Sequence, residues 1–272
     1  MLRRSPGEVS VTVGGVSDSS SVRVERSDGV LWLRLHHPKS RNALSVDDMQ
    51  ALTAALRDDA RDPGDRCAVI TGHEPGSFCS GFRLDENAPG EMQSGRAKQA
   101  ADELFALLPA VSIPVIAVVD GPARGAGTEL ALRCDLRIAS DHASFAIPAA
   151  RLGIPYTPPS VEFLTRRFGQ GAVAWLFYAS AQVGAAEALR LGLVHQVVAA
   201  KRLRTITGEL TARLAQSAPL VLRLFKAAVS SAEGVGDGEA VRDAFRAANT
   251  SEDFAETLRA IAERREPDFT GR

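Results

Sequence analysis

The chain has 272 residues, 45% of them hydrophobic, and a formal net charge of −1. This is enough apolar material for a large core in one domain, with or without an appendage. The near-neutral charge argues against a nucleic-acid or anionic-membrane partner. Three cysteines without paired spacing argue against a disulfide framework or a metal site. The first residues lack an apolar core after their arginines, so we expect no secretory signal and a cytoplasmic protein.

The first third of the chain predicts strands interleaved with helices. Residues 1–20 are rich in Ser, Gly and Val, and we expect a flexible tail there. Alternating residues on either side of the turn at 27–29 predict a β-hairpin. Ser45 or Asp47 is a suitable cap for a helix that runs to about residue 59. A buried strand is predicted at 68–72, and a helix at about 98–110.

The middle of the chain holds its most informative segment. The apolar run 115–119 (VIAVV) predicts a strand, and the glycine-rich turn 121–128 (GPARGAGT) leads from it into a helix beginning near Glu129. Such a turn directs unpaired backbone N–H groups of the helix start into a cleft. A dinucleotide fold has a similar outline, but counting from Gly125 the sixth position is Leu130, so the GxGxxG pattern fails. A carboxylate beside anion-stabilising N–H groups indicates chemistry on a carbonyl.

The last part of the chain is predicted to be mostly helical. Two strands are expected first, at 136–139 and 143–146, and from about residue 160 the pattern is helical. Strands with interleaved helices followed by a helical third predict an α/β core with a helical C-terminal region.

Six motifs, in order, resemble those of the crotonase superfamily, also called the enoyl-CoA hydratase/isomerase superfamily. Residues 35–44 (LHHPKSRNAL) resemble L-x-R-P-x-x-x-N-A-L, and residues 69–72 with 78–81 resemble V-L-T-G with F-C-A-G. Residues 121–129 resemble G-x-A-x-G-G-G-x-E. The remaining matches are 134–139 (CDLRIA), 187–194 (EALRLGLV) and 263–272 (ERREPDFTGR). The resemblance spans nearly the whole chain from about Val22.

The resemblance implies a crotonase-type ββα-superhelix core with a helical C-terminal region. Its boundaries would be a tail at 1–20, the core at 21–200 and helices for trimerisation at 201–272. It further implies a homotrimer or hexamer.

The resemblance also implies a coenzyme A thioester as substrate and no other cofactor. The backbone N–H groups of Phe82 and Ala126 would form an oxyanion hole, with Glu129 as the catalytic carboxylate. Substrate-binding positions carried over by the motifs, or expected from their charge to contact CoA phosphates, are Lys39, Arg41, Ala43, Gly81, Leu84, Gly125 and Gly127. We expect residues 85–98 and 154–160 to shape the acyl pocket.

Three positions depart from the family pattern. Phe82 stands where an alanine is usual, and Ala126 replaces a glycine, yet both keep a backbone N–H. Residues 145–153 (FAIPAARLG) match F-G-x-P-E-x-x-x-G, but the slot of the second catalytic glutamate is Ala149, which carries no proton.

Other side chains are candidates for that missing role. Glu162 is the candidate second acid or base, although a glutamate in the first turn of a helix capped by Ser160 is the plainer interpretation. Asp85, Glu86 and Tyr156 are further candidates. His195 reads as structural, and Cys79 as a buried core residue without a matched histidine.

The sequence therefore favours an acyl-CoA-processing enzyme that hydrates or isomerises a 2-enoyl-CoA. Two alternatives remain open. The chain could be an acyl-CoA-binding homologue with weak or no hydratase activity, or a decarboxylase or thioester hydrolase of the same fold.

Overall fold

The computed structural model describes residues 21–58, 64–72, 76–83, 90 and 95–272. The predicted tail at 1–20 and the candidates Leu84, Asp85 and Glu86 lie outside these residues.

Within the described residues, six strands form a large sheet and three form a small one. The large sheet has the order β1-β2-β3-β4-β6-β9, with β1 antiparallel to β2 and the other neighbours parallel. Its strands are β1 (Val22–Ser27), β2 (Val30–Leu35), β3 (Cys67–Gly72), β4 (Val115–Val119), β6 (Leu136–Ser140) and β9 (Gln196–Val198). The small sheet has the order β5 (Pro122–Arg124), β7 (Ser144–Ala146), β8 (Val183–Gly184).

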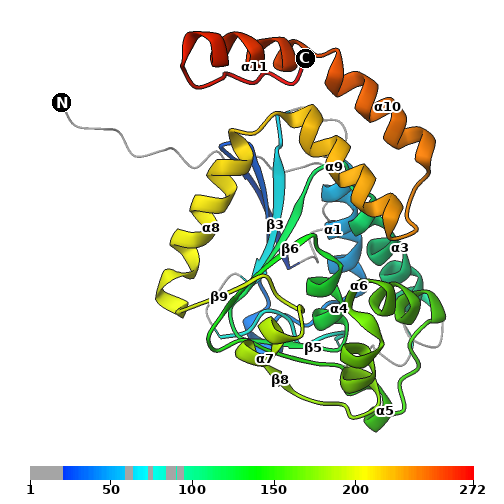
Figure 1. Cartoon of the computed structure of the whole chain (residues 1–272). Helices are drawn as coiled ribbons and strands as arrows, with labels where there is room; N and C mark the ends of the chain where they lie inside the picture. The colour runs from blue at the N-terminus through cyan, green and yellow to red at the C-terminus, as the bar shows by residue number, and fades with distance from the viewer. Residues whose placement is uncertain (1–20, 59–63, 73–75, 84–89, 91–94) are drawn as a thin grey trace.

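The helices pack on both faces of the large sheet. In chain order they are the short η1 (Pro38–Ser40), α1 (Val46–Asp58), α3 (Arg96–Ala110), α4 (Ala126–Arg133), α5 (Ala149–Leu152), α6 (Pro158–Phe177), α7 (Ala185–Arg190), α8 (Ala200–Ala215), α9 (Pro219–Ala232), α10 (Gly238–Asn249) and α11 (Glu252–Glu263). Figure 1 shows α8 on one face and α1, α3 and α4 on the opposite face. None of the helices in the described part of the chain is long and apolar enough to cross a membrane.

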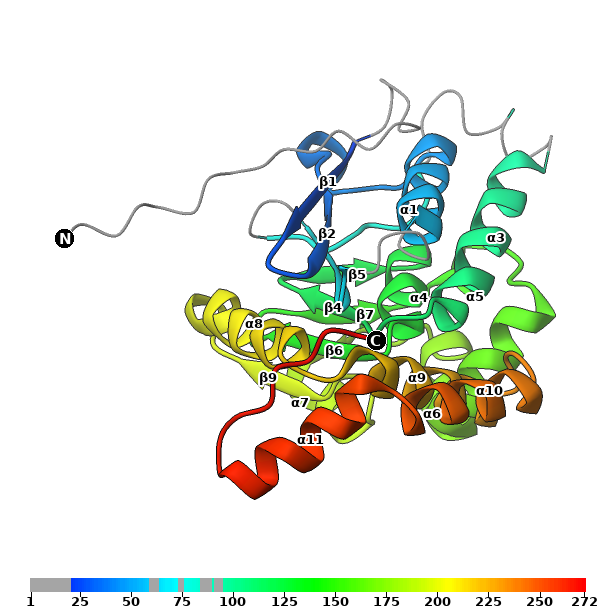
Figure 2. The ribbon, with the colours of Figure 1, turned by 90° about the horizontal axis from the view of Figure 1, so that it is seen from above.

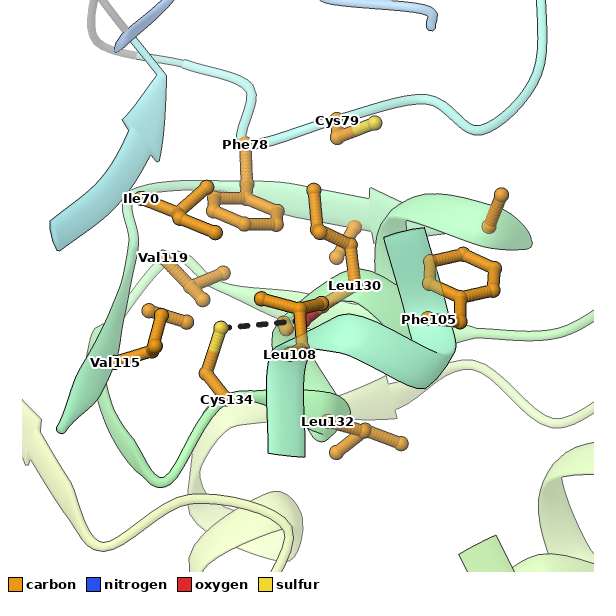
Figure 3. Close-up of a cluster of buried hydrophobic side chains, with 14 of the residues drawn as sticks. Ile70, Phe78, Cys79, Phe105, Leu108, Val115, Val119, Leu130, Leu132 and Cys134 are labelled. Carbon is orange, nitrogen blue, oxygen red and sulfur yellow. Dashed lines mark hydrogen bonds between the residues drawn. The ribbon is translucent and has the colours of Figure 1, made fainter. Parts of the chain in front are cut away.

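Coverage of both faces explains the unbroken apolar runs of the central strands. Alternate residues of β3 point to opposite sides: Ile70 enters the large core, while Val69 enters a second cluster with Leu203 of α8. In the large core, Figure 3 shows Ile70 and Phe78 beside Leu130 of α4. A strand buried on both faces is apolar throughout rather than alternating.

The predicted strands and helices are present, with three differences. Helix α4 begins at Ala126, three residues before the expected start, and a strand, β5, lies inside the predicted turn. The region expected to be wholly helical also contains β8 and β9, which are too short to give a clear period-2 pattern. Ser160 does not cap α6, because that helix starts at Pro158 with Thr157 as its N-cap.

The C-terminal helices extend along the outside of the molecule. Lys226 of α9 is tied to Asp135 at 2.5 Å and donates to the Leu108 carbonyl, which anchors α9 on the core. Helix α10 packs on α9, and α11 lies at the periphery in both views (Figures 1 and 2). Asp253 of α11 accepts hydrogen bonds from the backbone N–H groups of Thr270 and Gly271, so the last residues fold back along α11.

Candidate active site

The glycine-rich turn positions the start of α4. Gly121 has φ of 107° and Gly125 has φ of 50°, a region that L side chains rarely adopt. The Gly125 N–H donates to the Ala146 carbonyl of β7 at 2.8 Å, which fixes the turn on the small sheet. Gly125 is the N-cap of α4, so Ala126 is the first residue of the helix.

A second segment, residues 76–83, lies directly against this helix start. A Cβ at position 127 would lie 2.3 Å from the Cys79 carbonyl oxygen, and one at position 81 would lie 3.0 Å from the Arg124 carbonyl oxygen. Cys79 also pairs with Ala123 in an isolated parallel bridge. Gly127 therefore allows close backbone packing against Cys79, and its predicted contact with substrate stays a prediction.

Two backbone N–H groups meet at this junction. The Ala126 nitrogen would lie 3.6 Å from a Cβ at position 81, so it is adjacent to Gly81 and hence to Phe82. Leu44 donates to the Gly81 carbonyl and accepts from the Arg83 N–H, which turns the Phe82 N–H away from that bridge. Ala126 has no preceding helical turn to supply an acceptor. Among the described residues, no backbone hydrogen bond uses either N–H.

Glu129 lies one turn into α4 and is 2% exposed. Arg133, four residues later, donates from Nε to Glu129 Oε1 at 2.9 Å, and its Nη2 also lies 2.9 Å from that oxygen. Burial raises the pKa of the Glu129 carboxyl, while Arg133 and the Ser160 hydroxyl oppose the increase. Glu129 is thus a buried carboxylate in an ion pair, and burial holds its pKa above the ordinary value.

Arg133 is a site residue that the sequence analysis did not single out. It also donates to the Phe105 carbonyl and to Ser160 Oγ, and its guanidinium lies 4.4 Å from the centroid of the Phe163 ring. Burial lowers the pKa of Arg133, and Glu129 counteracts the decrease. The available signal was the Glu129–Arg133 spacing of four residues, which places both side chains on one face of a helix.

Ala149, which occupies the motif position of the second catalytic glutamate, is buried at the start of α5. That helix ends at Gly153, and the Ile154 N–H donates back to the Ala149 carbonyl at 3.0 Å. The chain then brings Tyr156 to the α4 N-terminus, where its hydroxyl would lie 3.9 Å from a Cβ at Gly125. The structure therefore brings Tyr156, one of the further candidates, to the site.

The loop 37–44 docks on the same junction. The Asn42 side chain accepts from the His37 N–H and donates to the Ser77 carbonyl, and Ser80 N–H donates to the Arg41 carbonyl. Ala43 is buried, while Lys39 and Arg41 are exposed. Burial lowers the pKa of Arg124, and the positive charge of Arg41 adds to the decrease, so two guanidinium groups lie near each other beside the turn.

Glu162 is not brought to the site. It lies exposed on α6, whereas Ser160 and Phe163 of that helix turn inward to contact Arg133. Leu84, Asp85 and Glu86 fall in the part of the chain that the structure does not describe.

Cys79 and His195 have the structural environments expected of them. Burial raises the pKa of the Cys79 thiol to about 12, which leaves little of the reactive thiolate. Burial, with the nearby Arg137, lowers the pKa of His195 to about 4, and its Nδ1 accepts from the Arg137 backbone N–H.

A cavity of about 680 Å³ lies on the Arg133 side of Glu129. It lies between α3, α6 and the segment before α10, and its lining includes Lys98, Phe105, Arg133, Phe163 and residues 157–160. Lys98 and residues 157–160 belong to the two stretches that the sequence predicted to shape an acyl pocket.

Comparison with known proteins identifies the family. The family model described as enoyl-CoA hydratase/isomerase matches residues 25–272. The chain belongs to this family. Among its relatives, crotonyl-CoA hydratase of Syntrophomonas wolfei subsp. wolfei is 31% identical over 256 residues, covering 92% of this chain and 97% of that protein. Carnitinyl-CoA dehydratase of Salmonella arizonae is 34% identical over 264 residues, covering 93% and 99%.

The fold agrees with the family. The solved structure of enoyl-CoA hydratase from Bacillus anthracis has a TM-score of 0.84 and 29% identity, covering 93% of this chain and all of that chain. The enoyl-CoA hydratase/isomerase protein described here therefore has the crotonase fold that its motifs predicted.

Proposed function

We propose that this protein binds an acyl-CoA thioester and adds water to, or isomerises, a 2-enoyl-CoA. The observation that supports this most is the junction of Gly81–Phe82 with Ala126. There, two unused backbone N–H groups adjoin a buried carboxylate, Glu129. Relatives named as crotonyl-CoA hydratase and 2,3-dehydroadipyl-CoA hydratase support the substrate class.

In hydration, Glu129 would act as both base and acid. It accepts a proton from water as the water oxygen bonds to C3, and the C2–C3 π electrons shift toward the thioester oxygen. The Phe82 and Ala126 N–H groups stabilise that developing oxyanion. The enolate then takes the same proton back from Glu129 at C2, which restores the carboxylate and completes the addition of water.

The end of the acyl group remote from the thioester would occupy the cavity that Arg133 lines. Lys39, Arg41 and Arg124 would bind the CoA phosphates, because guanidinium and ammonium groups bind phosphate oxygens well. No metal or redox cofactor takes part in this proposal.

The buried Ala149 favours a second candidate, an acyl-CoA-binding protein with weak or no hydratase activity. Removing one of two acid/base groups lowers such a rate by about 10²–10⁴-fold. Ala149→Glu separates the candidates: a wild type without turnover whose A149E variant hydrates crotonyl-CoA would be a binding member of the family.

The main test is Glu129→Gln with crotonyl-CoA. Gln keeps size and hydrogen bonding but is no base, so turnover should fall about 10²-fold or more while CoA-thioester affinity stays within a few-fold. Steady-state absorbance, product mass and calorimetry measure both quantities. Glu209→Gln on the exposed surface of α8 is the control, and unchanged turnover in E129Q would reject the assignment.

A further inference from the structure

Tyr156 presents a buried hydroxyl group that no other described residue binds. The ring is held edge-on against Phe177, with centroids 4.9 Å apart and planes at 89°. The side chain as a whole is partly buried, but its hydroxyl oxygen is shielded from solvent and has no hydrogen-bond partner within the described part of the chain. An unpaired buried hydroxyl is unfavourable in the free protein, and a ligand oxygen would relieve this cost.

The position of this hydroxyl relates it to the proposed chemistry. It lies 3.9 Å from the position of a Cβ built at Gly125, the residue that precedes Ala126 at the start of α4. Its loop is tied by the Ile154–Ala149 hydrogen bond to the slot where the second carboxylate is missing. Burial raises the pKa of the Tyr156 phenol, and the charge of Glu129 raises it further, so the two groups are close enough to interact.

We infer that the Tyr156 hydroxyl donates a hydrogen bond to the oxygen that is added at C3, as water before the reaction and as the 3-hydroxyl group after it. This inference rests on the proposed hydration and names the group that holds the water in place of the absent carboxylate. Tyr156 transfers no proton: Glu129 removes and returns it as described above. A neutral phenol remains a donor across the working pH range, while Glu129 remains the acceptor, so the two groups have complementary roles.

The test is Tyr156→Phe, which keeps the ring and its contact with Phe177. The other tyrosine of the chain, Tyr178, is 82% exposed, and Tyr178→Phe is the matched control. In Y156F, kcat for crotonyl-CoA should fall about tenfold or more with little change in KM, because water positioning is lost but thioester binding is kept. The thermal midpoint should stay the same or rise, since no protein hydrogen bond is removed.

A binding measurement in the E129Q background, which lacks the base, tests the inference without turnover. Calorimetry with 3-hydroxybutyryl-CoA should show affinity weakened about fivefold when Y156F is added to E129Q, the size of one hydrogen bond. Butyryl-CoA, which lacks the hydroxyl, should bind within about twofold of its affinity for E129Q alone by the same reasoning.

The outcomes separate this inference from the proposed function. A wild type that hydrates no enoyl-CoA would reject the function, yet selective loss of 3-hydroxybutyryl-CoA binding in Y156F would still support the role of Tyr156. If Y156F leaves turnover and both affinities unchanged, the inference is overturned and the function stands. Equal weakening of both ligands, or a lowered thermal midpoint, would also overturn it, because either result indicates a structural role.

Discussion

The proposed catalytic carboxylate, Glu129, forms a buried ion pair with Arg133. Glu129 and Arg133 are both buried, and removing one partner of such a pair leaves an uncompensated charge, which typically costs about 3–5 kcal/mol. Arg133 also contacts Phe105, Ser160 and Phe163, so it joins α3, α4 and α6 around Glu129. We therefore regard Arg133 as the residue that positions Glu129 and opposes the increase of its pKa.

Arg133→Met should shift the pH dependence of the reaction. The guanidinium opposes the effect of burial on the Glu129 pKa, so its loss raises that pKa further. Because the base must be ionised, the acid limb of kcat/KM should move to higher pH. Steady-state rates measured across pH on crotonyl-CoA would show the shift.

Arg133→Lys is the matched variant, since it keeps the charge and loses the forked geometry. We expect a smaller shift of the limb than in R133M. A variant that is merely unstable would lose amplitude at every pH without moving the limb. An acid limb that stays in place or moves to lower pH would contradict this role for Arg133.

At the scale of secondary structure, the site depends on how closely α4 meets the segment 76–83. At Gly127 the backbone packs directly against the Cys79 carbonyl, a contact that the sequence did not indicate. Both Gly81 and Gly127 allow backbone atoms to approach closely, and this approach sets the distance between the Phe82 and Ala126 N–H groups. Packing of the segment 76–83 against the start of α4 therefore produces the proposed oxyanion hole.

Gly127→Ala should destabilise the fold and weaken catalysis. Its Cβ would meet backbone atoms that cannot move independently, so we expect a loss of at least about 2 kcal/mol in the free energy of unfolding. Denaturant titration measures this. Gly208→Ala in α8, where no atom lies within 4 Å of the new Cβ, should instead stabilise by about 0.5–1 kcal/mol. Equal stabilities of the two variants would mean that the close approach at Gly127 is unimportant.

At the scale of the whole molecule, the C-terminal helices are the part with unburied apolar surface. Large apolar side chains are exposed along α9, α10 and α11: Phe225, Val229, Phe245, Phe254, Leu258 and Ile261. Together they expose more apolar surface to water than monomeric proteins usually do. A second copy of the chain is the occupant that the crotonase resemblance suggests.

We predict self-association through these helices. Light scattering should give three or six times the chain mass of 28.9 kDa at micromolar concentration. Ile261→Asp, at a side chain 70% exposed on α11, should lower that mass because it would place a charge in the contact. Leu152→Asp is the control, because this side chain is 61% exposed and belongs to α5, which lies far from α11 in Figure 1. A monomeric wild type would refute the prediction.

The sequence alone determined the family and the order of most strands and helices, and it named the residues of the candidate site. Its signals were local: apolar runs in β3 and β4, glycines where the backbone turns at 121 and 125, and a carboxylate just after the turn. These need no partner from elsewhere in the chain, so the hairpin, the buried strands and Glu129 near the helix start were all predictable. The sequence also showed directly that position 149 carries an alanine in place of a carboxylate.

Only the tertiary structure decided what surrounds Glu129. The contacts of Arg133 with Phe105 and Ser160 span 28 and 27 positions, and Tyr156 reaches Gly125 from a different loop. Ser160 and Glu162 differ by two positions in one helix, yet one faces Arg133 and the other solvent. Such differences come from the rotation of a helix against its neighbours and from close backbone packing. Neither leaves a periodic signal in the sequence, because each depends on residues that meet only after the chain has folded.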